Sequence, residues 1–302
     1  MRILILGSEG FIGQQVVKLA ISEAHHVYGV DLINKTTFEY FYSKLSLLSS
    51  DFDLFLSAET FDVIINCSGS GNVSFSLESP LTDFDLNTRS IVIILEAVRK
   101  YQRKAKYIHV SSAAVYGNPQ TLPISETAPL QPVSPYGYHK WISELVCKEY
   151  EALYGLRIAI VRPFSIYGPG LKKQLLWDIF QKANSQDEIV LWGTGEETRD
   201  FLFIEDAAKA LLKIGTDSND KFGIYNLAFG QSVTIKCVAD LMLESLGWKK
   251  KIFFNGVVKE GNPRFWEADI SAIRAKGFQP SIALFEGIKL TTHWLLACRT
   301  SH

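Results

Sequence analysis

Short apolar segments that alternate with helical segments are the feature that most constrains the fold of this chain. The apolar segments cover residues 3–6, 26–30, 63–65, 107–110 and 157–161, and each is followed by a polar or small residue. Residues 87–100 and 136–154 have the periodicity of helices, and the second stretch is followed by Gly155, a common residue at helix C-termini. Alternating buried strands and helices predict an α/β fold with a doubly wound parallel sheet.

The regularity weakens after about Tyr167, where glycine and proline interrupt shorter periodic segments. These interruptions are Gly168-Pro169-Gly170, Gly193-Thr194-Gly195 and Gly261-Asn262-Pro263. We expect one domain over residues 1–166 and a smaller C-terminal α/β domain over residues 167–302, from which the chain can cross back to the first.

Composition excludes several classes of function. The 302 residues carry 31 Lys and Arg against 32 Asp and Glu, so the chain has no basic excess for binding nucleic acid. Its four cysteines lie far apart without a C-x-x-C pair, which predicts reduced thiols and no metal site. No apolar run approaches the roughly 20 residues of a membrane span. We therefore expect a cytoplasmic protein that binds small molecules.

Glycines at positions 7, 10 and 13 stand between the first strand and the first helix. In this context glycines let the backbone approach a pyrophosphate at the N-terminus of the helix. The spacing is G-x-x-G-x-x-G, and a turn that serves only tight packing of strand and helix would look the same. We assign cofactor contacts to Gly7, Ser8, Gly10, Phe11, Ile12 and Gly13.

Asp31 closes the second strand about 20 residues further on, where a carboxylate can bond the ribose hydroxyls of NAD and repel a 2′-phosphate. The alternative is an ordinary aspartate in the turn after a strand. Together with the glycines, Asp31 predicts that residues 1–166 form an NAD(P)-binding domain of Rossmann type, with NAD favoured over NADP.

Tyr136 and Lys140 lie four residues apart on a predicted helix and therefore on one face. A nearby ammonium favours the phenolate, so we expect a lowered tyrosine pKa and a useful general base. A solvated helix face would show the same pair. Ser111 and Ser112 end the preceding strand, at the edge where ligands of open parallel sheets bind.

Five motifs in this order resemble the extended short-chain dehydrogenase/reductase superfamily, and its NAD-dependent nucleotide-sugar epimerase/dehydratase branch matches closely. The branch includes the UDP-galactose (UDP-glucose) 4-epimerases. The motifs are Gly7-x-x-Gly10-x-x-Gly13, Ser111-Ser112-Ala113-Ala114-Val115-Tyr116-Gly117, Tyr136-x-x-x-Lys140, residues 162–169 (RPFSIYGP) and residues 199–206 (RDFLFIED).

The resemblance implies roles for these residues. Tyr136 would be the acid/base, Lys140 would hold the nicotinamide ribose, and Ser112 would position the sugar hydroxyl. Further implied cofactor contacts are Asp31, Leu32, Cys67, Ser68, Gly69, Ser111 and Pro163. Implied contacts to a nucleotide-diphosphate sugar are Ser112, Ser165, Leu191, Trp192, Arg199 and Arg264, with Arg199 on the pyrophosphate.

Departures from the family pattern reduce the number of reactions that the resemblance allows. Sugar dehydratases of this branch carry Thr-Asp-Glu where this chain has Ser112-Ala113-Ala114, which disfavours dehydration. An epimerase acting through a transient 4-keto sugar and an NAD(P)H-dependent reductase of a 4-keto-6-deoxy sugar nucleotide both remain. Asp31 favours the epimerase, which retains its own NAD. A non-catalytic NAD(P)-binding regulatory protein is less favoured, because such proteins tend to lose the tyrosine or the lysine.

Other departures concern binding. Ser165 replaces the usual asparagine, and Cys67-Ser68-Gly69 stands where a histidine usually precedes two small residues. Lys259 replaces a late arginine, with Arg264 as a stand-in. The resemblance also implies a homodimer built from helices 87–100 and 136–154, in which Ile91, Ile94 and Leu95 face either the partner or the sheet, and a role in polysaccharide biosynthesis.

Overall fold

A seven-stranded parallel sheet forms the centre of the computed structural model, which describes residues 1–34, 39–217, 222–257, 261 and 263–300. The order across the sheet is β10-β6-β5-β4-β1-β2-β3, and every neighbouring pair is parallel. The strands are β1 (Arg2–Leu6), β2 (His26–Asp31), β3 (Phe41–Lys44), β4 (Val63–Asn66), β5 (Lys106–Val110), β6 (Arg157–Pro163) and β10 (Gly223–Leu227).

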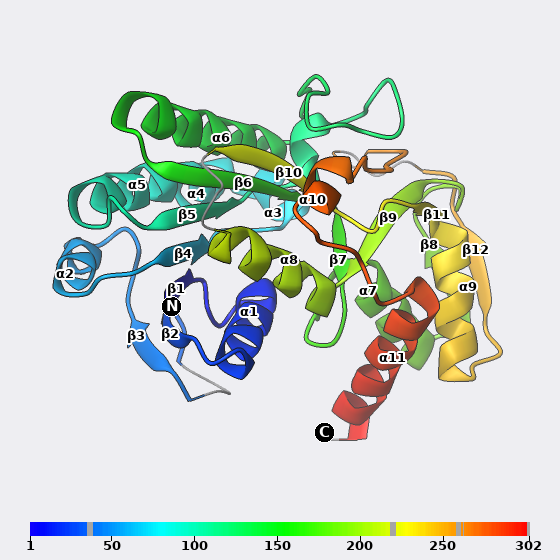
Figure 1. Ribbon diagram of the computed structural model, residues 1–302. Coiled ribbons are helices and arrows are strands. Elements are labelled where there is room, and N and C mark those ends of the chain that lie inside the picture. Colours follow the sequence, from blue (N-terminus) through cyan, green and yellow to red (C-terminus); the bar gives the residue numbers. More distant parts are fainter. Residues whose placement is uncertain (35–38, 218–221, 258–260, 262, 301–302) are drawn as a thin grey trace.

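Helices cover both faces of this sheet (Figure 1). Successive residues of a strand point to opposite faces, so Ile3 and Ile5 belong to one hydrophobic cluster and Leu4 and Leu6 to the other. The first face packs against α1 (Phe11–Ser22) and α8 (Ile204–Thr216); the second packs against α2 (Ser50–Ala58), α5 (Ser90–Tyr101) and α6 (Pro135–Tyr154).

The predicted doubly wound parallel sheet is confirmed, and all five expected strands belong to it. The helix expected from residue 87 begins as an α-helix only at Ser90, because Asp85–Arg89 forms a π-helical turn. Two shorter helices precede that turn, α3 (Val73–Glu78) and α4 (Pro80–Phe84). The strands β3 and β10 were not predicted.

The C-terminal half adds two small sheets, to the right in Figure 1. One contains β7 (Ser165–Tyr167), β9 (Thr198–Phe203) and β11 (Ser232–Thr234), and the other pairs β8 (Glu188–Leu191) with β12 (Lys251–Phe254). The remaining helices are α7 (Gln174–Ser185), α9 (Ile235–Leu246), α10 (Ser271–Ala275) and α11 (Leu284–Thr300). Within the described ranges, no helix combines the length and the apolar character needed to cross a membrane.

Candidate active site

The loop after β1 requires glycine at two positions because the backbone is crowded there. Gly7 has a φ of +73°, and a Cβ on it would lie 2.8 Å from the backbone of Ser68. A Cβ on Gly13, in the first turn of α1, would lie 2.0 Å from the Gly7 carbonyl oxygen. Gly10, the N-cap residue, offers no side chain to the N–H groups of α1. These N–H groups therefore point toward an open edge that suits an anion.

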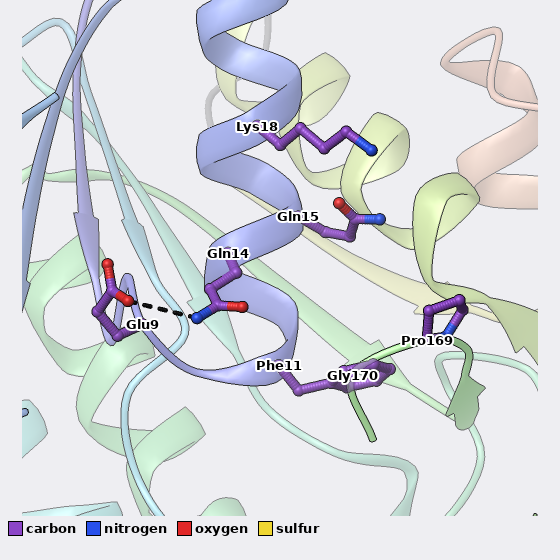
Figure 2. Close-up of a pocket in the computed structure, with 7 residues that line it drawn as sticks. All are labelled: Glu9, Phe11, Gln14, Gln15, Lys18, Pro169 and Gly170. Atoms are coloured by element: carbon purple, nitrogen blue, oxygen red, sulfur yellow. Dashed lines mark hydrogen bonds between the residues drawn. The ribbon is translucent and has the colours of Figure 1, made fainter. Parts of the chain in front are cut away.

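A pocket of about 290 Å³ opens beside this loop (Figure 2). Phe11, Gln14, Gln15 and Lys18 of α1 line it from one side, and Pro169 and Gly170, which follow β7, approach it from the other. Glu9 also lines it and accepts a hydrogen bond of 3.3 Å from the Gln14 side chain. The loop before α1 thus borders a hollow that lies between the N-terminal and C-terminal halves of the chain.

Asp31 faces the same loop from the end of β2. Its carboxylate accepts hydrogen bonds from the Glu9 N–H at 3.0 Å and from the Leu32 N–H at 2.7 Å. The Glu9 carboxylate is also at this end, where it accepts a hydrogen bond from the Tyr40 hydroxyl. Two carboxylates therefore lie at the site expected for an adenosine ribose, which strengthens the electrostatic argument against a 2′-phosphate. The side chain of Leu32 is exposed.

Tyr136 and Ser112 meet at the carboxyl end of β5. Ser134 caps α6 by accepting a hydrogen bond from the Gly137 N–H at 3.2 Å, and this places Tyr136 in the first turn of the helix. Burial raises the pKa of Tyr136 to about 12, and its hydrogen bond with Ser112 opposes that rise. The expected lowering of the tyrosine pKa is therefore wrong for the protein alone, because desolvation outweighs every favourable partner.

Lys140 lies one turn further along α6 and is only 4% exposed. Its Nζ donates to the Val110 carbonyl oxygen at 2.9 Å, which ties the ammonium to the end of β5. Burial lowers the Lys140 pKa to about 8, although the charge of Asp83 acts in the opposite direction. A buried cation in this position can donate hydrogen bonds to a ligand and can stabilise a nearby anion.

A buried ion pair beneath these residues was not predicted from the sequence. Glu144, one turn after Lys140, accepts hydrogen bonds from Arg162 of β6 at 2.9 and 2.6 Å. The Ser111 hydroxyl donates to the same carboxylate at 2.6 Å. The Ser111 side chain is therefore directed into the protein. The signal for Glu144 was its spacing, since it shares a helix face with Tyr136 and Lys140.

The loop after β4 contains the predicted Cys67, Ser68 and Gly69. Burial raises the pKa of the Cys67 thiol to about 12, so it is neutral at physiological pH. Ser68 donates its N–H and hydroxyl to the Asn66 side chain. Gly69 has a φ of +108°, and a Cβ on it would lie 2.5 Å from Oδ1 of Asn87.

Asn87 is a second residue that the sequence reasoning missed. It lies in the π-helical turn before α5, is fully buried, and donates through Nδ2 to Asp83 at 3.0 Å. Its Oδ1 is buried and has no hydrogen-bond partner among the described residues. A buried acceptor of this kind is costly unless a ligand supplies the donor.

The predicted phosphate-binding arginines lie side by side in the C-terminal half. The guanidinium of Arg199 donates to the carbonyl oxygens of Thr198, Pro263 and Arg264 at 2.7, 2.8 and 3.2 Å and lies over the Trp266 ring. Burial lowers its pKa to about 10. An arginine whose described hydrogen bonds go to neutral carbonyl groups keeps its charge for an anionic ligand.

The other predicted substrate contacts differ in exposure. Trp192 is 54% exposed, whereas Leu191 is 2% exposed and its side chain packs in the core. Pro163 ends β6, and Ser165 begins β7 with its side chain partly exposed. Lys259 and Asn262 lie outside the described residues. In the described part of the chain, no group of three histidine, cysteine, aspartate or glutamate side chains is placed to hold a metal ion.

Comparison with known proteins identifies the family of the chain. The model of the NAD dependent epimerase/dehydratase family matches residues 3–228. A Methanocaldococcus jannaschii protein, provisionally named as a UDP-glucose 4-epimerase, is 30% identical over 97% of this chain and 98% of its own length. The UDP-glucuronate 4-epimerase of Thermodesulfobacterium geofontis is 29% identical over 96% of this chain and 95% of its length. The crystal structure of a Thermotoga maritima UDP-glucose 4-epimerase with UDP-glucose superposes with a TM-score of 0.90 at 25% identity, covering 99% of this chain and all of that one.

Proposed function

Because the chain belongs to the NAD dependent epimerase/dehydratase family, we propose that it is an NAD-dependent epimerase that inverts C4 of a nucleotide-diphosphate sugar through a transient 4-keto sugar. The observation that carries this proposal is the meeting of Ser112, Tyr136 and Lys140 at the carboxyl edge of the sheet, next to the glycine loop. The relatives named for UDP-glucose and UDP-glucuronate support a UDP-sugar as the substrate.

The residues around the loop fit NAD. Gly7 and Gly13 leave no room for a Cβ, so the backbone itself forms the cradle for a pyrophosphate. Asp31 supplies a carboxylate for the ribose hydroxyls, and its charge with that of Glu9 opposes the phosphate of NADP. Asn87 offers, beside Gly69, an acceptor that has no hydrogen-bond partner among the described residues.

Tyr136 and Ser112 perform the proton chemistry. NAD, held by the glycine loop and Asp31, would supply an acceptor for the hydride of the sugar C4 and a donor for its return. Ser112 holds the C4 hydroxyl while Tyr136 accepts its proton, so a C4 ketone forms. After the 4-keto sugar rotates in the site, Tyr136 gives the proton back to the C4 oxygen. A hydride returned to the opposite face of C4 would then complete the epimer. The positive charge of Lys140 stabilises the tyrosinate that exists between these steps.

Dehydration is disfavoured by the residues that follow Ser112. Ala113 and Ala114 stand next to the catalytic serine, and Ala113 is fully buried. Neither side chain can give or take a proton, and elimination of water from a sugar needs both an acid and a base. A 4-epimerase needs only the serine, the tyrosine and the lysine.

We also propose that the two parts of the chain bind different ligands. Residues 1–166 bind NAD and residues 167–302 bind the nucleotide sugar, with β10 and α8 returning to the first part. Arg199 and Arg264 contact the diphosphate, and Trp192 contacts the nucleotide base. The four free cysteines and the use of NAD favour the cytoplasm as the place of action.

The protein is proposed to be a homodimer through the outer faces of α5 and α6. Val92, Ile142 and Leu145 are 40%, 36% and 48% exposed on these two contacting helices. Ile91, Ile94 and Leu95 are at most 1% exposed and pack on the sheet, so they do not serve the interface.

The experiment incubates the purified protein with UDP-, dTDP-, GDP- and CDP-sugars and follows both the sugar, by chromatography, and absorbance near 340 nm. We expect conversion of a UDP-sugar to its C4 epimer with retained NAD and no net absorbance change.

Tyr136→Phe should lower turnover by about 10²- to 10⁴-fold and keep bound NAD. Stoichiometric consumption of added NAD(P)H with a 4-keto sugar would show a reductase, and NAD binding without any turnover would show a regulatory protein.

A further inference from the structure

Asn87 donates to a carboxylate that is itself completely buried. Asp83 is 0% exposed, and its Oδ1 accepts the hydrogen bond from Nδ2 of Asn87. A carboxylate only accepts hydrogen bonds, so Asn87 must present its NH₂ group to Asp83. The orientation of an amide side chain is often ambiguous, but here the Asp83 carboxylate fixes it. Oδ1 of Asn87 is therefore turned toward Gly69.

The second oxygen of Asp83 is held by a side chain of the catalytic helix. Nδ1 of His139 lies 2.6 Å from Oδ2 of Asp83, and the same acceptor argument assigns the proton to Nδ1. The His139 side chain is only 13% exposed. Its ring meets Phe84 edge to face at 5.3 Å, and its backbone carbonyl accepts a hydrogen bond from Thr88 at 2.9 Å. His139 lies between Tyr138 and Lys140 in the sequence. Its side chain therefore connects α6 to α4, and its carbonyl oxygen connects α6 to the π-helical turn that carries Asn87.

We propose that Asp83 and His139 are positioning residues for the cofactor, which lock the Asn87 amide with its oxygen directed at the loop of residues 67–69. The proposal rests on NAD binding at this edge of the sheet. The group that Asn87 Oδ1 accepts from is a hydroxyl or amide donor of the nicotinamide half of NAD, because that half must lie next to Tyr136 for hydride transfer.

A swap of the two side chains tests the order of donor and acceptor. In Asn87→Asp, two carboxylates face each other without a donor between them, and we expect NAD to bind at least tenfold more weakly. In Asp83→Asn, the amide at position 83 keeps its oxygen on His139 and turns its NH₂ group toward Asn87. Asn87 must then turn its own oxygen away from Gly69, and we expect NAD affinity to fall several-fold to about tenfold. In the double variant D83N/N87D, the amide at position 83 donates to the carboxylate at position 87, whose other oxygen again faces Gly69. We expect the double variant to return to within about threefold of the native NAD affinity.

The readout is the NAD dissociation constant from titration calorimetry, with the dissociation constant of UDP measured on the same samples. His139→Leu removes the donor to Asp83 and should weaken NAD binding several-fold, whereas Tyr138→Phe, at the exposed neighbouring position, is the matched control and should leave it unchanged. UDP affinity should stay native in all variants, which a general loss of structure would not allow.

Two results would overturn the proposal. One is a double variant that binds NAD no better than Asp83→Asn alone, and the other is a native NAD affinity in Asp83→Asn and His139→Leu. If Asn87→Asp alone does not fold, the comparison of Asp83→Asn with the double variant decides the question. Because no turnover is measured, the result does not depend on whether the substrate is epimerised.

Discussion

At the scale of single residues, the site contains groups whose burial destabilises the protein when no cofactor is bound. Lys140 is 4% exposed, and its lowered pKa of about 8 reflects the cost of an ammonium away from water. Relative to the ordinary value of 10.5, this shift corresponds to roughly 3 kcal/mol against the charged form at neutral pH. Such a cost is expected where a site is organised for a ligand and not for stability.

We therefore expect Lys140→Met to abolish turnover and to stabilise the cofactor-free protein at pH 7. The unfolded chain keeps the proton on lysine up to about pH 10.5, whereas the folded protein releases it near pH 8. The native protein thus gains stability as the pH rises from 8 toward 10.5, and its disadvantage relative to the variant shrinks. Urea unfolding of both proteins across this pH range measures the difference. A variant that is less stable at pH 7 would contradict the assignment.

The sequence was sufficient to predict that Tyr136 and Lys140 share a helix and that Ser112 follows a strand, because spacing along a helix and position at a strand end are local properties. It was not sufficient for the pKa of Tyr136, which depends on burial that only the packed protein reveals. Asn87 was missed for a similar reason: its importance rests on one unpaired oxygen, and that is a property of the fold around it.

At the scale of elements, the ion pair between Glu144 and Arg162 joins α6 to β6 next to the proposed active site. Both side chains are at most 1% exposed, and the carboxylate also holds Ser111. A buried pair of this kind contributes little net stability, but the loss of one partner leaves an uncompensated buried charge.

We expect Glu144→Leu and Arg162→Met each to lower the free energy of unfolding by about 3–5 kcal/mol. The double variant Glu144→Leu with Arg162→Met should recover much of that loss, because no unpaired charge remains. Denaturant unfolding of the four proteins measures the coupling. Strictly additive losses would show that the pair does not act as a unit.

The strands that were predicted are those with apolar runs buried on both faces, such as β1 and β4. β3 escaped prediction because it is a short edge strand with partly exposed residues. β10 was not predicted because its partner β6 lies about 60 residues earlier in the chain. The place of β10 in the sheet is therefore set by tertiary contacts and not by a local sequence pattern. The π-helical turn at Asp85–Arg89 likewise has no signature in the apolar periodicity.

At the scale of the whole molecule, the proposed dimer gives a direct prediction. Sedimentation equilibrium should give twice the chain mass of 33.9 kDa. Val92→Asp with Leu145→Glu should shift the protein to the monomer, because charges would replace apolar groups on the proposed interface. Leu290→Glu, at an equally exposed position on α11, is the control and should leave the mass unchanged. A native protein that sediments as a monomer would contradict the interface.

We propose that one protein molecule removes a hydride from C4 of the sugar and returns it to the other face. The most direct measurement uses UDP-glucose and UDP-glucuronate that carry deuterium at C4, with NMR and mass analysis of the products. We expect a C4 epimer that keeps all of its deuterium, with no deuterium in the solvent and no net change in NAD. A product that has lost deuterium from C4, or one that forms only as added NAD(P)H is consumed, would contradict it.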